Sequence, residues 1–169
     1  HDSHRRQRQM CIRDRFYLDF VSAFKKGDDD QTPWTPAINL AMGWAAALNV
    51  LKEEGLENRW NRCGDLAKGV RNLFLDLGFE LLAEVSQRSA TVTAILYPPG
   101  INDDWRSDLK EKYQTQVIGA QDEFKGKMFR VGSMGETSRE EMIEGCTRML
   151  HCFREHGHSI PEVDVASYF

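Results

Sequence analysis

The segment Lys127–Ser133 (KMFRVGS) has the apolar character of a β-strand, broken by a single arginine. A second segment, Thr91–Tyr97 (TVTAILY), is rich in β-branched residues and ends at a Pro-Pro-Gly sequence that favours a turn. Two weaker segments, Phe79–Val85 and Thr115–Gly119, also favour strands. Short strands that follow one another closely predict an α/β (α+β) fold, with a small mixed or antiparallel sheet and helices packed on one face.

Helical segments surround these strands. Leu56–Leu77 and Thr137–Phe153 repeat apolar residues every three or four positions, so each presents one apolar face, and we expect both helices on the same face of the sheet. A shorter helix follows Asn102, which is placed to cap it. The segment Pro36–Glu54 is different, because it is apolar nearly all round, and Gly55 ends it as a C-terminal cap.

The long apolar helix Pro36–Glu54 needs cover on several sides, and this chain has few elements to supply it. We therefore infer a further domain, a second subunit, or both. In the chain alone, we expect the side chains of Leu40, Met42 and Trp44 to form an exposed apolar surface. The sequence is thus interpreted as one piece of a larger protein.

Local signals predict where several segments begin and end. Thr35 is a candidate N-cap, and Pro36 suits the first helical position. Thr137 and Glu140 have the spacing of a capping box at the start of the last helix. From Gly157 onward, we expect an irregular tail.

The overall composition is that of a globular domain: of 169 residues, 41% are hydrophobic and 28% charged. The formal net charge of −4 gives no electrostatic case for nucleic acid or an anionic membrane as a partner. Four cysteines fit no zinc pattern and are too few for a disulfide scaffold, so we expect a reducing, cytoplasmic compartment. They are Cys11, Cys63, Cys146 and Cys152. Cys152 and His156 are one helical turn apart, but no second cluster supplies further ligands, so no metal site is expected.

Residues 1–15 differ from everything after them. They are rich in His, Arg, Gln and Asp, and they follow neither helical nor strand periodicity. They fit a disordered basic arm, an arm that binds nucleic acid, or a segment that is not native. The string Met10–Arg15 (MCIRDR) resembles the translation of a sequencing adapter, so we favour a non-native segment.

Arg130 is the first candidate binding residue. An arginine in an otherwise apolar strand is costly to bury unless it is paired. It fits a strand with one solvated face, and it also fits a site that holds a carboxylate between two guanidinium donors. Gly126 and Gly132 on either side would let a ligand approach.

Thr32 and Thr35 are the second candidates. Hydroxyl groups and free amides at a helix entrance can hold a phosphate, although simple capping explains the same spacing. Nucleotide-binding, zinc-protease and serine-hydrolase motifs are absent. Lys25 and Lys26 lie in a charged loop, which does not provide the desolvated site that a Schiff-base lysine needs.

Four segments, in order and with matching gaps, resemble the class V family of pyridoxal-phosphate aminotransferases, in particular the serine–pyruvate and alanine–glyoxylate group. They are Thr32–Pro36 (TPWTP), Glu54–Trp60 (EGLENRW), Arg88–Ala94 (RSATVTA) and Lys125–Gly135 (KGKMFRVGSMG). The resemblance extends over roughly residues 16–156. It implies that residues 16–35 are the end of a large domain and a linker, 36–158 the C-terminal small domain of a fold-type I enzyme, and 159–169 a tail.

The resemblance also implies a cofactor, a reaction and site residues. The large domain of the family binds pyridoxal 5'-phosphate and supplies the Schiff-base lysine, which this chain lacks, so the chain alone is expected to be inactive. Thr32 and Thr35 would reach the cofactor phosphate of the neighbouring subunit in a homodimer, and Arg130 would bind the α-carboxylate of the substrate. The reaction would move an amino group between a serine- or alanine-type amino acid and a pyruvate- or glyoxylate-type keto acid. Many relatives have tyrosine at the position of Thr32, and many have Gly-Gly where this chain has Gly119-Ala120.

The competing hypothesis is a stand-alone α+β module that binds or dimerises without catalysis. It requires a natural start to the chain and cover for the first long helix within its own fold. Among enzymes of the implied fold, phosphoserine aminotransferases and cysteine desulfurases are alternatives. A desulfurase would need a catalytic loop cysteine, and only Cys11, in the unusual first segment, has such a position.

Overall fold

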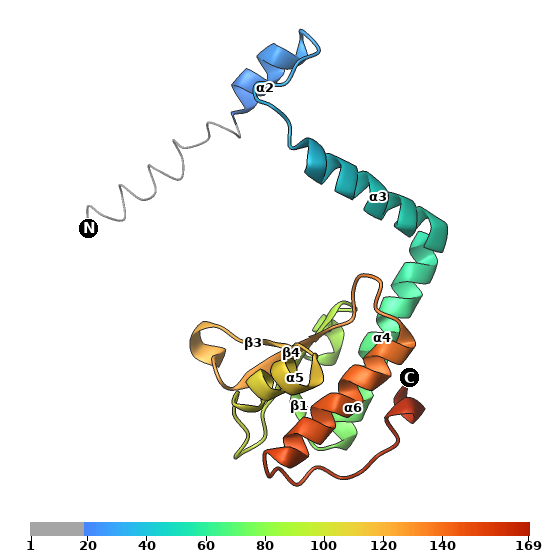
Figure 1. The fold of residues 1–169 in the computed structure, drawn as a ribbon, viewed down its shortest axis with the longest axis vertical. Helices are drawn as coiled ribbons and strands as arrows, with labels where there is room; N and C mark the ends of the chain where they lie inside the picture. Colours follow the sequence, from blue (N-terminus) through green and yellow to red (C-terminus); the bar gives the residue numbers. More distant parts are fainter. Residues whose placement is uncertain (1–18) are drawn as a thin grey trace, which may run out of the picture. The chain divides into compact units, whose positions relative to one another are not determined.

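The computed structural model describes residues 19–169 (Figure 1), so the expectations for residues 1–15 and for Cys11 lie outside the described residues. The chain divides into two compact units, one extending to Glu53 and the other covering Glu54–Phe169. The first unit contains helix α2 (Phe20–Gly27) and nearly all of helix α3 (Ile38–Glu54).

Helix α3 confirms the prediction of a long helix with uncovered apolar surface. None of its residues is buried, and the side chains of Leu40, Met42 and Trp44 are 76%, 68% and 69% exposed. Gly55 ends the helix with a φ angle of +85°, a conformation that glycine adopts without steric cost. The exposed surface of α3 supports the inference that another domain or subunit covers it.

The second unit is built on a four-stranded sheet in the order β1-β2-β4-β3, in which every neighbouring pair is antiparallel. The strands are β1 (Glu80–Leu81), β2 (Val92–Leu96), β3 (Ile118–Gly119) and β4 (Met128–Gly132). The predicted sheet is confirmed, and its two central strands match the two strongest sequence signals. The edge strands are shorter than expected, since each pairs with its neighbour over two residues only.

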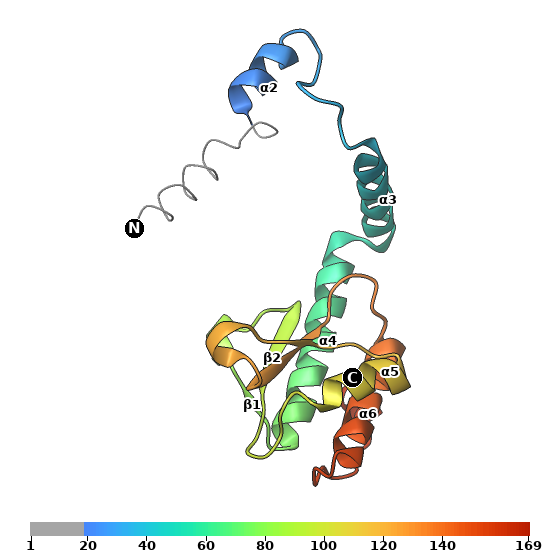
Figure 2. The ribbon, with the colours of Figure 1, turned by 60° about the vertical axis from the view of Figure 1, so that its left-hand side comes forward.

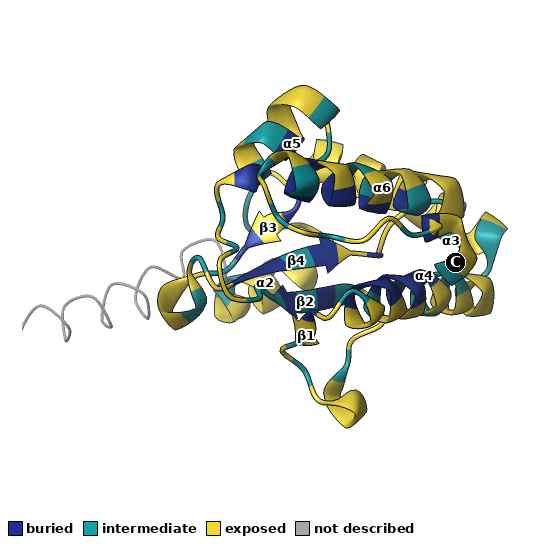
Figure 3. Ribbon diagram, turned by 90° about the horizontal axis from the view of Figure 1, so that it is seen from below, coloured by how far each residue is buried: buried dark blue, intermediate teal, exposed yellow. Residues whose placement is uncertain are grey.

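Three helices cover one face of this sheet (Figure 2). They are α4 (Leu56–Asp76), α5 (Trp105–Tyr113) and α6 (Arg139–Glu155). The ring of Phe129 on β4 lies 5.5 Å from Phe74 of α4, 5.2 Å from Trp105 of α5 and 5.9 Å from Phe153 of α6, measured between ring centroids. Contact of all three helices with one side chain confirms that α4 and α6 pack on the same face. Their buried residues lie on their inner sides (Figure 3).

The C-terminal residues are more ordered than the sequence suggested. A 3-10 helix, Val165–Tyr168, follows Asp164, whose carboxylate accepts a hydrogen bond from the backbone amide of Ala166 at 3.1 Å. Val165 is buried in the core, and the ring of Phe169 lies over Gly69 of α4. The expectation of an irregular tail was therefore wrong for these last residues.

The capping predictions were displaced by one or two residues. The capping box of α6 uses Ser138 and Glu141, while the hydroxyl of the predicted residue, Thr137, donates to the carbonyl of Met134 at 3.1 Å. Helix α3 begins at Ile38, so Thr35 does not occupy its N-cap position. The physical reason at α6 is that Thr137 and Ser138 both fit the capping pattern, and the turn that precedes the helix engages the first of them.

Candidate functional site

Arg130 lies at the centre of the sheet, on the face opposite the helices. Its strand neighbours Phe129 and Val131 are buried and point to the helical side, and side chains alternate along a strand. In the sheet register, Arg130 is opposite Ala94 of β2 and Ile118 of β3. Ala94 is small and Ile118 is 51% exposed, so the guanidinium group lies on an open, half-buried surface.

The Arg130 guanidinium is oriented by one uncharged acceptor. Its Nη2 donates to the carbonyl oxygen of Gly119 at 2.8 Å, and its Nε donates to the same oxygen at 3.2 Å. Within residues 19–169, Arg130 makes no ion pair and its Nη1 has no hydrogen-bond partner. The side chain is therefore held in place while donors of its planar fork stay available for a ligand.

Gly119 supports this arrangement through its lack of a side chain. A Cβ atom at this position would lie 2.1 Å from Nη1 of Arg106, which packs against the glycine. Arg106 is held in turn by Asp103, with 2.9 Å between Nη1 and Oδ2, and Asp103 accepts a hydrogen bond from the hydroxyl of Tyr97 at 2.7 Å. Burial and this bond to Asp103 raise the pKa of Tyr97, so its hydroxyl stays protonated as a donor.

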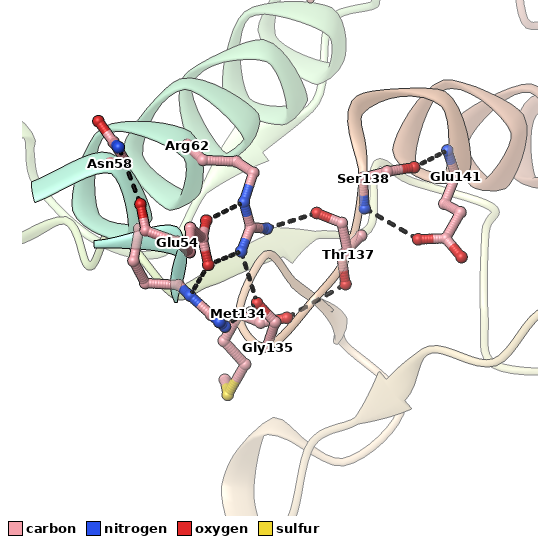
Figure 4. Close-up of polar contacts among 9 residues, drawn as sticks. Glu54, Asn58, Arg62, Met134, Gly135, Thr137, Ser138 and Glu141 are labelled. Atoms are coloured by element: carbon pink, nitrogen blue, oxygen red, sulfur yellow. Dashed lines mark hydrogen bonds and ion pairs between the residues drawn. The ribbon is translucent and has the colours of Figure 1, made fainter. Parts of the chain in front are cut away.

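A polar network ties the start of α4 to the loop after β4 (Figure 4). Nε of Arg62 donates to the Glu54 carboxylate at 2.7 Å, while its Nη1 and Nη2 donate to the carbonyl oxygens of Thr137 at 2.6 Å and Gly135 at 2.8 Å. Arg59 also contacts the Glu54 carboxylate and the Gly135 carbonyl. These contacts connect two of the four sequence motifs, Glu54–Trp60 and Lys125–Gly135.

The contacts in this network shift the pKa values of Glu54 and Arg62 so that both side chains favour their charged forms. The hydrogen bond from Arg62 is the main cause that lowers the pKa of Glu54, and the carboxylate raises the pKa of Arg62. Sequence reasoning missed these residues as positioning groups. The available signal was the spacing of one acidic and two basic residues around Gly55, but the partner carbonyls come from a loop more than 70 residues away.

Thr32 and Thr35 belong to the first unit, whereas Arg130 belongs to the second. The Thr32 hydroxyl donates to the carbonyl of Trp34 at 2.7 Å. Thr35 is exposed, and its hydroxyl makes no hydrogen bond with residues 19–169. Neither hydroxyl caps α3. The Thr35 hydroxyl can donate to a ligand, whereas the Thr32 hydroxyl would first have to give up its bond to Trp34.

Other kinds of site find no support in the described part of the chain. No group of three His, Cys, Asp or Glu side chains gathers in residues 19–169 as a metal site would require. Cys152 donates to the carbonyl of Trp105 at 3.3 Å, and His156 lies 3.2 Å from the Asp108 carboxylate. Between residues 19 and 169, no helix has the length and apolar character needed to cross a membrane.

Comparison with known proteins relates the chain to a group of enzymes, although no family model matches it. The chain is 39% identical to an uncharacterized aminotransferase of Methanocaldococcus jannaschii over 153 residues, which is 89% of this chain and 40% of that protein. It is 35% identical to the serine–glyoxylate aminotransferase of Hyphomicrobium methylovorum over 133 residues, covering 78% of this chain and 33% of that enzyme. The crystal structure of an alanine–glyoxylate aminotransferase from Nostoc sp. superimposes with a TM-score of 0.75 at 27% identity, over 82% of this chain and 38% of that one.

The chain is related to the class V aminotransferases. This finding confirms the resemblance drawn from the four motifs and the fold expected from it. The chain spans 40% or less of the length of these class V relatives.

Proposed function

We propose that this chain is the C-terminal part of a pyridoxal-phosphate-dependent aminotransferase that moves an amino group between a serine- or alanine-type amino acid and a pyruvate- or glyoxylate-type keto acid. The relationship to the class V aminotransferases supports the reaction class. The single observation that carries the proposal is Arg130, a half-buried cation on the helix-free face of the sheet with no anionic partner in residues 19–169.

Arg130 is proposed to bind the α-carboxylate of both substrates. A guanidinium group matches the two oxygens of a carboxylate, which fixes the orientation of the bound acid as well as its position. The bonds to Gly119 would hold the arginine before the substrate arrives, so less conformational freedom is lost on binding. A fixed carboxylate in turn fixes the direction of the bond between Cα and its hydrogen, which must break in amino transfer.

Thr35, together with Thr32, is proposed to hold the cofactor phosphate. The exposed Thr35 hydroxyl has no partner in residues 19–169, so it can donate a hydrogen bond to a phosphate oxygen. The two prolines beside these threonines restrict the conformation of the loop. When bound, pyridoxal phosphate supplies an electron sink for the substrate Cα. The contribution of this chain would be binding and orientation.

The organisation of the complete protein is also part of the proposal. We infer a small domain over residues 36–158, preceded by the end of a large domain at 16–35 and followed by residues 159–169, in a homodimer. The exposed apolar side chains of α3 support cover by another domain or subunit. A cytoplasmic location is supported by three buried cysteines that form no disulfide, Cys63, Cys146 and Cys152.

A chimera tests the proposed reaction. The chain from Phe16 onward would replace the corresponding C-terminal part of the Hyphomicrobium serine–glyoxylate aminotransferase, and amino transfer from serine to glyoxylate would be measured with added pyridoxal phosphate. We expect activity that depends on the cofactor. A chimera that folds and binds the cofactor but transfers no amino group from serine or alanine would contradict the proposal.

A further inference from the structure

A second cationic site lies between α4 and β2, on the helical side of the sheet. Arg71 of α4 and Arg88, which precedes β2, line a small cavity of about 20 Å³. Ser89 and Thr93 line the same cavity, and Leu81, Ala83, Val92 and Ala94 complete its wall. Because side chains alternate along β2, the side chain of Thr93 lies on the opposite face of the sheet from those of Ala94 and Arg130.

The two arginines share a cavity without a carboxylate to neutralise them. Nη1 of Arg71 donates to the carbonyl of Ser89 at 3.1 Å, and Nε of Arg88 donates to the carbonyl of Ala83 at 3.3 Å. Within residues 19–169, neither guanidinium group forms an ion pair. Burial, followed by the nearby charge of Arg88, lowers the pKa of Arg71.

Thr93 provides an independent indication of a ligand. Its side chain is buried, with 5% of the residue exposed, and its hydroxyl has no hydrogen-bond partner within the described residues. Buried hydroxyl groups nearly always find a partner, so one that lines a cavity beside two guanidinium groups indicates a missing acceptor. An anion would accept hydrogen bonds from the hydroxyl and from both arginines.

We propose that this cavity binds a small inorganic anion the size of chloride. A cavity of about 20 Å³ holds one water-sized group, which fits a single small anion. The anion would bridge α4 to the start of β2 and relieve the repulsion between Arg71 and Arg88. The site does not depend on the proposed aminotransferase function.

The test compares chloride with gluconate, an anion too large for the cavity, at equal ionic strength so that general screening is the same. The melting temperature of the 169-residue chain would be measured in each sodium salt, together with the ³⁵Cl resonance linewidth, which broadens when chloride exchanges with a protein site. We expect chloride to raise the melting temperature by about 2–4 °C and to broaden the line. Equal melting temperatures and an unbroadened line for the unaltered chain would overturn the proposal.

Two kinds of variant locate the effect. Arg71→Gln and Arg88→Gln should each lose most of the chloride-dependent shift and line broadening. Thr93→Val keeps the shape of the side chain and removes a hydroxyl without a partner, so it should fold as well as the unaltered chain in gluconate yet show a smaller chloride effect. If Thr93→Val and the arginine variants all retain the full chloride effect, the anion binds elsewhere and the proposal is wrong.

Discussion

Gly69 offers a test of how the C-terminal residues dock on the core. A Cβ atom at this position would lie 2.4 Å and 2.6 Å from two ring atoms of Phe169 and 2.9 Å from the carbonyl oxygen of Tyr168. These distances are too short for real contacts, so Gly69→Ala must displace the tail. The substitution therefore has two opposing effects on stability: alanine favours the helix, and its Cβ atom clashes with the C-terminal residues.

The expected magnitude follows from those two effects. Replacing glycine by alanine inside a helix such as α4 stabilises it by about 1 kcal/mol. Overpacking against a well-filled site costs about 1–3 kcal/mol. The intact chain should therefore lose up to roughly 2 kcal/mol of unfolding free energy. In a chain that ends at Asp164 the clash is absent, and the same substitution should stabilise by about 1 kcal/mol.

The assay is urea unfolding of four proteins: the intact chain and the shortened chain, each with Gly69 or with alanine. The difference between the two Gly69→Ala effects measures the coupling between α4 and the tail, and we expect about 1–3 kcal/mol. A substitution that stabilises both chains equally would show that Phe169 does not lie against Gly69 in solution.

Two further predictions concern titratable groups. The hydrogen bond from Arg62 lowers the pKa of Glu54 in the folded chain. The ionised Glu54 carboxylate therefore stabilises the fold above the ordinary carboxyl pKa of 4.5, and this stabilisation is lost as pH falls through the lower pKa of the folded chain. In a plot of unfolding free energy against pH, Glu54→Gln should therefore reduce the loss of stability at acid pH, whereas the neighbouring Glu53→Gln should not. Identical curves for both variants would show that the bond between Glu54 and Arg62 does not stabilise the fold. Burial raises the pKa of Cys146 to about 12 and of Cys152 to about 11. In a Cys11→Ser background at pH 8, both thiols should react with a thiol reagent only as fast as the protein unfolds, and rapid labelling of the folded chain would contradict their burial.

The sequence was most informative where local pattern and packing agree. Strand β4 was predictable because apolar residues surround Arg130, and β2 because its β-branched run ends at a strong turn signal. The edge strands β1 and β3 were predicted too long because an apolar run does not show how far a neighbouring strand extends. Strand length at an edge depends on the partner, which local sequence does not contain.

The candidate site was only partly predictable, for the same reason. Arg130 was identified because a charge in an apolar strand is unusual, but its bonds to Gly119 depend on the pairing of β3 with β4. The network of Glu54 and Arg62 was missed because its other members are backbone carbonyls from a distant loop. Backbone acceptors leave no mark in a sequence, so such contacts become visible only in the folded chain.

The most direct test of the central claim is the substrate KM of the chimera after Arg130→Lys. A lysine keeps the charge and loses the two parallel donors, and a charge-assisted hydrogen bond is worth about 1.5–3 kcal/mol, so KM should rise roughly ten- to a hundred-fold for both the amino acid and the keto acid. Arg130→Ala should cost more, while Arg148→Lys, on α6 and paired with Glu144, serves as the control and should leave KM unchanged. Unaltered KM values in both Arg130 variants, with the fold intact, would contradict the assignment of Arg130 as the carboxylate-binding residue.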